Sequence, residues 1–285
     1  MVYLLALGSA LFYGAADFTG GLTSRRAGAL QVVVISQFSG MALLALLLPL
    51  LPSASPARAD LLWGVAAGLT GGVGVALLYR ALAIGTMAVV APTTAVCAVA
   101  IPVVVAVLLG ERPLPLAVAG ILLGIVSIIL VSQQQRSEAR SSASPRRLPL
   151  GVGSALASGV AIGFFFLSLA RTTPDAGMWP LLVSRLASVV LFSSIAVTRR
   201  SSFRMPAGVA ALVVAAGVID MLANALYLLA ARQGPLSIVV TLSSLYPAST
   251  VLLARLILHE RLSNLQVTGV VCALAAVALI VSGGR

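Results

Sequence analysis

The sequence of 285 residues contains no lysine, one histidine (His259) and two cysteines, Cys97 and Cys272. A Walker-type phosphate-binding loop requires a lysine, so this chain has no ATP-hydrolysing site of that kind. One histidine is too few for a metal cluster, and two cysteines inside apolar runs support neither a disulfide framework nor a zinc site. We therefore expect the protein to use no metal and no other cofactor.

Charged residues are also scarce, at 9%, whereas 60% of the residues are apolar and the mean hydropathy is +1.11. Soluble domains contain only about 45–50% apolar residues. All 18 basic residues are arginines, and nearly all lie in short gaps between apolar runs. That distribution is typical of membrane-protein loops, so it predicts a partner in the lipid bilayer and not in nucleic acid.

Ten apolar runs follow one another along the chain, at 3–21, 30–51, 61–83, 87–109, 115–132, 150–170, 178–198, 207–230, 236–257 and 265–283. Each has about the length that a helix needs to cross a bilayer, and in lipid every backbone amide must be paired within its own segment. The sequence therefore predicts an all-α integral membrane protein with ten transmembrane helices. Amphipathic rings, which favour the headgroup layer, lie near the proposed span ends at Tyr3, Trp63, Tyr79 and Trp179.

The two halves of the chain form a repeat. A polar linker, 133–149, separates residues 1–132 from 150–285, and each side carries five runs. At an offset of 149 the following pairs match: Gly68 and Gly217, Leu77 and Leu226, Ala81 and Ala230, Gly85 and Gly234, Glu111-Arg112 and Glu260-Arg261, and Gly120 and Gly269. Because five spans are an odd number, the second copy enters the membrane from the opposite side. We expect two inverted five-helix repeats, a common construction of secondary transporters whose substrate site lies near mid-membrane.

The orientation follows less directly from the loops. Arginines concentrate in the loops after the first, third, fifth, seventh and ninth spans. By the positive-inside rule, the linker is then cytoplasmic and both termini face outward. Cytoplasmic termini stay open as the alternative.

The tails of the two halves, LLGERPLPLAVAGILLGIVSIILVS and ILHERLSNLQVTGVVCALAAVALIVS, carry the same Glu-Arg turn followed by a glycine-bearing helix. This pattern resembles the closing helix pair of the EamA-type repeat in the drug/metabolite transporter superfamily. A polar residue in the second helix, Arg185 in the second half and Gln37 in the first, also resembles that family. His259 stands where the family usually has glycine. The resemblance implies a carrier, often an exporter, of small metabolites or drug-like solutes.

Asp220 is the strongest candidate for a transport residue, because ionisable groups within membrane spans usually face a cavity or a partner. Gly217, Asp220, Asn224 and Tyr227 follow helical spacing and form one polar or small stripe. The equivalent first-half positions are Gly71 and Val75. The stripe either binds a polar or cationic group, carries a proton, or makes a structural hydrogen bond between helices.

Two further charged residues lie within the runs. Asp17 shares a face with Tyr13 and Ser9, but it is close to the end of its run, so solvation at the interface is an equal alternative. Arg185 either pairs with Asp17, Asp220 or a substrate carboxylate, or extends its stem to the headgroups.

Prolines and glycines suggest where helices bend or approach closely. Pro92, Pro102 and Pro247 lie inside the fourth and ninth runs and would kink them, which makes Tyr246 beside Pro247 a candidate pocket wall. The opposing interpretation is ordinary packing. Gly64, Gly68 and Gly72 form a face for close helix approach. The two Glu-Arg turns are expected to satisfy helix ends and one another.

Three classes of function compete. The leading one is secondary transport of a small-molecule solute across a cell membrane, most simply the bacterial plasma membrane, by a multi-pass carrier that alternates access between its repeats. Coupling to protons through Asp17 or Asp220, exchange and downhill flow are all open, as is the oligomeric state. The alternative is a non-transporting membrane partner or lipid flippase subunit. A membrane enzyme would need a nucleophile motif, a histidine pair or a metal constellation, so we expect no enzyme.

Overall fold

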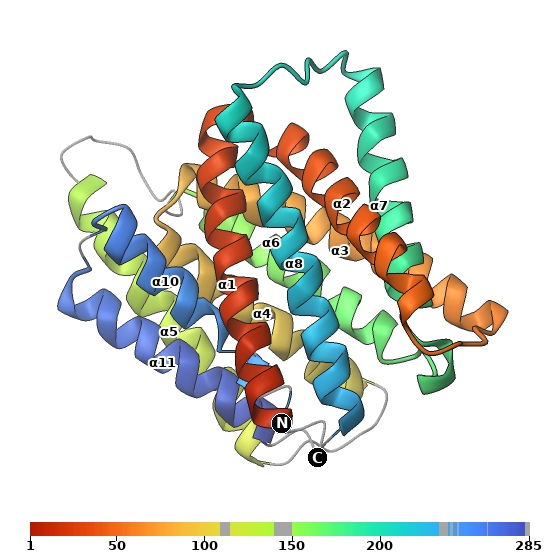
Figure 1. Cartoon of the computed structure of the whole chain (residues 1–285). Coiled ribbons are helices and arrows are strands. Elements are labelled where there is room, and N and C mark those ends of the chain that lie inside the picture. The colour runs from red at the N-terminus through yellow and green to blue at the C-terminus, as the bar shows by residue number, and fades with distance from the viewer. Residues whose placement is uncertain are drawn as a thin grey trace.

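The structure is a computed structural model that describes residues 1–108, 115–139, 150–233, 239, 242–243, 245–260 and 262–282. These residues form the following α-helices: α1 (Val2–Ala27), α2 (Ala29–Leu47), α3 (Arg58–Ile84), α4 (Met87–Leu108), α5 (Pro115–Ala139), α6 (Val152–Leu169), α7 (Trp179–Thr198), α8 (Ala207–Gln233), α10 (Tyr246–Ile257) and α11 (Asn264–Ser282). Two short 3-10 helices, η1 (Leu48–Leu50) and η2 (Pro174–Ala176), lie in the connections. The chain starts and finishes at the same end of the helix bundle (Figure 1).

Six of the described helices, α1, α2, α3, α6, α7 and α8, are long and apolar enough to cross a membrane, and α4, α5, α10 and α11 contain shorter apolar stretches. Large apolar side chains cover the outer surface, among them Leu4, Leu46, Leu62 and Leu256, each at least 62% exposed. Only a lipid surrounding makes such a surface favourable over the whole bundle. The predicted all-α, multi-pass membrane architecture is confirmed at this level.

Three helix boundaries differ from the predicted runs. Helix α1 continues to Ala27, and the Thr23 hydroxyl in this last part donates to the Thr19 carbonyl oxygen one turn earlier. Asp17 therefore lies well inside the helix and not near its end. Helix α5 continues to Ala139, into the polar linker. Helix α10 begins only at Tyr246, with Pro247 in its first turn. Proline is tolerated there because first-turn amides have no helical partner, so the prediction of a kink at Pro247 within one helix was wrong.

Helices of one half pack mainly against helices of the other, and the pairs recur with the halves exchanged. The contact of α1 with α8 corresponds to that of α6 with α3, and the contact of α1 with α10 corresponds to that of α6 with α4. Likewise, the contact of α2 with α8 corresponds to that of α7 with α3. The pairs α2–α7, α4–α10 and α5–α11 join equivalent helices of the two halves. The halves therefore form one interleaved body.

Glycines allow the closest of these crossings. A Cβ at Gly68 of α3 would overlap the Ser184 carbonyl of α7, and a Cβ at Gly217 of α8 would overlap the Ser36 carbonyl of α2. Ser188 adds a hydrogen bond of 2.6 Å from its hydroxyl to the Gly68 carbonyl oxygen. The glycine face of the third span lies against α7 as predicted, because Gly64 and Gly72 also meet residues of that helix.

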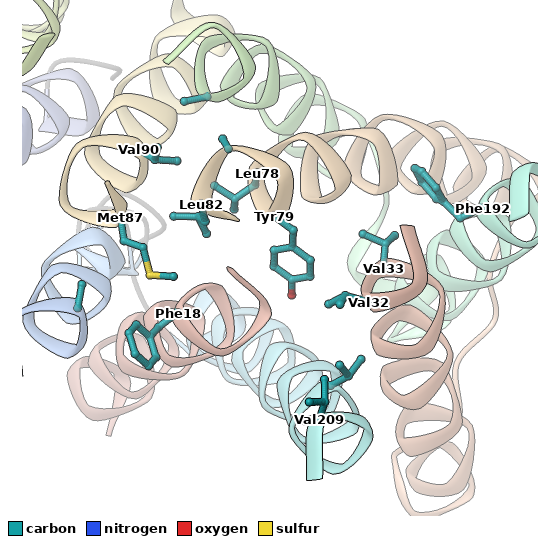
Figure 2. Close-up of a cluster of buried hydrophobic side chains, with 14 residues drawn as sticks. Phe18, Val32, Val33, Leu78, Tyr79, Leu82, Met87, Val90, Phe192 and Val209 are labelled. Atoms are coloured by element: carbon teal, nitrogen blue, oxygen red, sulfur yellow. The ribbon is translucent and has the colours of Figure 1, made fainter. Parts of the chain in front are cut away.

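A buried apolar cluster fills the end of the bundle that carries the loops after α1, α3 and α7, here called the arginine-rich end. It contains Phe18, Val33, Tyr79, Leu82 and Met87, which come from four helices and converge in Figure 2. Tyr79 is only 2% exposed and belongs to this cluster, so its predicted place in the headgroup layer was wrong. Its ring packs against Gly20, where no other residue would leave room.

Direct helix contacts within the two halves are unequal. Helix α1 contacts α2 and α3, and α2 contacts α3, through the cluster at the arginine-rich end. Among the described residues, the equivalent second-half pairs, α6–α7, α6–α8 and α7–α8, make at most marginal contact. A second buried apolar cluster, Leu44, Met178, Leu181 and Met221, joins α2, α7 and α8 toward the opposite end, so the difference lies in which helices touch directly.

An ionic contact, here called the Arg25–Glu260 clasp, ties the arginine-rich end across the halves. The Glu260 carboxylate accepts hydrogen bonds of 3.2 Å from the amides of Met87 and Ala88, which open α4. Arg25 donates to the carbonyl oxygen of Leu82 at 3.1 Å and lies 3.7 Å from Glu260. Glu260 thus satisfies a helix end, as predicted, but its charged partner is Arg25; Arg261, Glu111 and Arg112 lie outside the described residues.

Candidate functional site

A buried polar contact joins three helices at mid-molecule. Arg185 of α7 donates a hydrogen bond of 2.7 Å from Nη1 to Oε1 of Gln37 on α2. Its Nη2 forms an ion pair with the carboxylate of Asp220 on α8. Gln37 is 3% and Arg185 is 7% exposed. We call this set the Gln37–Arg185–Asp220 triad.

Electrostatics explains why Arg185 is accompanied by Asp220 and Gln37. A charge at the centre of a bilayer costs roughly 2.5–3.5 kcal/mol on insertion scales, so a buried arginine needs a counter-ion and acceptors. Asp220 supplies the charge and Gln37 an oxygen. Arg185 therefore stays inside the bundle, which excludes the interpretation that its stem reaches the headgroups. The guanidinium Nε remains buried without a hydrogen-bond partner.

The predicted stripe on α8 divides its contacts among neighbouring helices. Gly217 meets α2 and Asp220 meets Arg185 of α7. Asn224 is buried and donates from Nδ2 to the Asp220 carbonyl oxygen at 2.8 Å, which fixes the turn that holds the carboxylate. Tyr227 is half-buried and packs near Ala6 of α1. The stripe thus faces the interior between α1, α2 and α7.

Asp17 of α1 differs from Asp220 because its carboxylate has no hydrogen bond and no ion pair with any side chain that the structure describes. The carboxylate of Asp220 acts on it electrostatically and repels it. Asp17 is half-buried. Its position inside α1 removes the alternative of solvation at a span end. An uncompensated acid therefore lies beside a compensated Arg–Asp pair.

Tyrosines surround Asp17. Tyr13 lies one turn earlier on α1, and its ring stands edge-on to Tyr246 of α10 at a centroid distance of 6.1 Å. Tyr246 and Tyr79 are both close enough to Asp17 to interact electrostatically with it. Tyr13 interacts in the same way with Asp17, Arg185, Asp220 and Tyr227. Tyr13 therefore lies within electrostatic range of most of the predicted site residues and in ring contact with Tyr246.

The structure thus brings Asp17, Arg185, Asp220, Tyr227 and Tyr246 to one interior region, with Asn224 supporting Asp220. Sequence reasoning had placed Tyr13 only as a neighbour of Asp17 and had misplaced Tyr79. The sequence could not predict the contact between Gly20 and Tyr79, because that contact depends on how α1 and α3 cross. Among the described residues, no group of three His, Cys, Asp or Glu side chains could hold a metal ion.

A surface groove of about 410 Å³ between α3 and α6 lies elsewhere. Its lining is apolar apart from one threonine: Leu69, Thr70, Val73, Leu77, Ala157, Val160, Ala161 and Phe164. Several of these side chains belong to the exposed outer surface. Such a surface accommodates lipid chains and offers no charged group, so the interior region around Asp17 and the triad is the candidate site.

Comparisons with known proteins agree with this architecture. One solved crystal structure matches with a TM-score of 0.62 over 98% of this chain and 95% of its own, at 18% sequence identity, which shows a shared fold. No curated protein matches the sequence. The model of the EamA-like transporter family matches residues 1–133 and again 148–282. With both halves matched, the chain belongs to the EamA-like transporter family.

Proposed function

We propose that the protein is a secondary transporter of a small metabolite or drug-like solute, built from ten transmembrane spans in two inverted repeats. The exchange of helix pairs between halves supports inversion: α1–α8 corresponds to α6–α3, and α2–α8 to α7–α3. Gln37 and Arg185 are equivalent in the repeat, 148 residues apart, and touch each other. Two equivalent residues in contact lie at the pseudo-two-fold axis, where substrate sites of such carriers are found.

The observation that carries the proposal is the charged interior: Asp17, Arg185 and Asp220 meet inside a bundle whose outer surface is apolar. Purely structural helix packing would not need an acid without a partner. Solute would bind beside Tyr13, Tyr227 and Tyr246, which stay partly exposed.

In the proposed cycle, this structure is the state closed at the arginine-rich end. The apolar cluster around Tyr79 and the Arg25–Glu260 clasp hold that end together, while among the described residues α6, α7 and α8 make at most marginal direct contact with one another. By the arginine distribution the closed end is cytoplasmic, in a bacterial plasma membrane. Rocking of the halves would close the opposite end and open this one. The proposed net direction is export.

We further propose proton coupling through Asp17. Its carboxylate is free to change charge without breaking an ion pair, whereas Asp220 is held by Arg185. The groups that face Asp17 from the neighbouring helices are Tyr79 of α3, Asp220 of α8 and Tyr246 of α10, with Arg185 beyond Asp220. A proton on Asp17 would remove the repulsion between the two acids.

Transport by the purified protein in proteoliposomes tests the proposal. Vesicles are loaded with a mixture of amines, amino acids, sugars and nucleosides, and efflux is followed by mass spectrometry with and without an inward proton gradient. We expect selective efflux that an Asp220→Asn variant abolishes and an exposed-loop control, Asp175→Asn, retains. Vesicles in which no solute moves above the protein-free background would contradict the carrier and favour a non-transporting membrane partner or flippase subunit.

A further inference from the structure

The charge balance of the interior region identifies the chemistry of a ligand. Arg185 directs both terminal nitrogens to protein groups, one to Gln37 and one to Asp220. Its positive charge is therefore already neutralised before any solute arrives. A substrate carboxylate would have to displace Asp220 from the guanidinium, which would leave that acid buried and unpaired.

The charge of Asp17, unlike that of Arg185, is not neutralised by a described side chain. Its carboxylate accepts no hydrogen bond from the described residues, and the charged group that acts on it electrostatically is Asp220, another acid. If both acids are ionised, the three charges sum to one negative charge, and that charge belongs to Asp17. A partly desolvated carboxylate without a partner favours a cation.

The surroundings of Asp17 specify which kind of cation. Tyr13 and Tyr246 stand edge-on to each other one turn before it, and Tyr79 packs on Gly20, one turn after it. Faces of aromatic rings attract ammonium groups within about 6 Å. A hard metal cation would instead favour several carboxylate oxygens around one point, and the described residues contain no group of three His, Cys, Asp or Glu side chains that could hold a metal ion.

Resting on the proposed transport function, we infer that the solute is a monovalent organic amine whose ammonium group binds the Asp17 carboxylate among the tyrosine rings, with its apolar body toward Tyr13 and Tyr246. The Gln37–Arg185–Asp220 triad then acts as a neutral wall on the other side of the site. It excludes anions because its only cation is occupied.

Three probes of matched shape test this inference: benzylammonium, benzyl alcohol and phenylacetate, titrated by calorimetry into the full chain in lipid nanodiscs. We expect benzylammonium to bind about tenfold more tightly than benzyl alcohol, and phenylacetate not to bind. In Asp17→Asn the preference for the amine over the alcohol should vanish. Asp175→Asn, which removes an exposed acid from the loop before α7, should bind as the unmodified protein does.

A second pair of variants separates ring from charge. Tyr13→Phe keeps the aromatic face and should retain the affinity for benzylammonium, whereas Tyr13→Leu should weaken it by about threefold or more. Asp17→Glu keeps the negative charge and should retain the preference for the amine. Equal binding of all three probes, a preference for phenylacetate, or an amine preference that survives Asp17→Asn would overturn the inference.

The efflux experiment keeps the two proposals distinguishable. Selective efflux of a sugar or an anion without binding of benzylammonium would overturn the amine inference and leave the carrier standing. Binding of benzylammonium that depends on Asp17, without efflux of any solute from vesicles, would leave the amine site standing and contradict the carrier.

Discussion

The two halves of the chain share their framework and differ in their chemistry. Gly68 and Gly217 occupy equivalent positions and admit equivalent backbone contacts, to Ser184 and Ser36. In contrast, Asp220 corresponds to Gly71 in the first half, and Arg185 corresponds to Gln37. The glycines preserve a geometry that both halves need, because these two crossings each pair a helix of one half with a helix of the other.

The unequal residues create a site that neither half could make alone. The first half supplies Asp17, Tyr13 and Gln37, and the second supplies Arg185 and Asp220. A symmetric pair of sites would present two identical surfaces to the solute. The difference between the halves therefore gives the interior one directional binding surface, and variants can separate the shared framework from the unshared charges.

Breaking the ion pair should have the largest effect on stability. Asp220→Asn leaves Arg185 charged, buried and without a counter-ion, because a guanidinium cannot lose its proton in proteins. We expect about 3–5 kcal/mol of lost unfolding free energy, measured by chemical denaturation in detergent. Arg185→Gln should cost less, since the Asp220 side chain that it leaves unpaired is 16% exposed, against 8% for Arg185.

The double variant Arg185→Gln with Asp220→Asn provides the control. Removing both charges together should restore much of the stability that Asp220→Asn loses. If the double variant were as unstable as the single one, the loss would come from packing and not from an unpaired charge.

Altering the shared framework should have a smaller and symmetric effect. Gly68→Ala and Gly217→Ala each place a Cβ against a backbone carbonyl of the other half, which the helices can relieve only by separating. We expect each to lose about 1–3 kcal/mol, by similar amounts. Thermal unfolding of both variants in detergent measures this.

Gly153→Ala and Gly208→Ala serve as controls, since a Cβ at either position meets nothing within 4 Å. Both should be neutral or slightly stabilising, because alanine favours a helix over glycine. A large loss at Gly68 with none at Gly217 would show that the two crossings are not equivalent.

Removing the Arg25–Glu260 clasp should mainly affect the start of α4. Glu260→Ala takes both carboxylate oxygens from the amides of Met87 and Ala88 and the counter-ion from Arg25. We expect a loss of about 0.5–2 kcal/mol, seen most directly as faster amide hydrogen exchange in the first turn of α4. Exchange in the first turn of α8 should not change. Unchanged exchange in α4 would mean that Glu260 does not cap it.

The smallest stability effect is expected at Asp17. Asp17→Asn removes a carboxylate that has no partner among the described residues and that Asp220 repels. Stability should change by no more than about 0.5 kcal/mol in either direction, although the preference for an amine solute should be lost. A loss of several kcal/mol in thermal or chemical unfolding would assign Asp17 a structural role instead.

The sequence predicted the features that depend on local pattern. Run length located the helices, and the spacing of Gly64, Gly68 and Gly72 located a close crossing, because both signals lie within single helices. The repeat register predicted which positions of the two halves correspond. Such features need no knowledge of how distant helices cross.

What the sequence left open depends on tertiary contacts. It could not choose among Asp17, Asp220 and a substrate as the partner of Arg185, because that choice depends on the rotation of α7 and α8. Tyr79 was assigned to the membrane–water interface because it lies near the end of an apolar run. Its ring instead packs against Gly20 of α1, inside the bundle. Pro247 was predicted to kink a helix, but it lies in the first turn of α10.

The contact between Gln37 and Arg185 also bears on how a chain of this kind could arise. If two identical five-helix chains paired in opposite orientations, the residue at this position would face its own copy across the axis. Two glutamines can share a hydrogen bond there, but two buried guanidiniums would repel each other. An arginine at this position is therefore incompatible with two identical chains, and it fits a duplicated sequence in which one copy has changed while the other remains an amide.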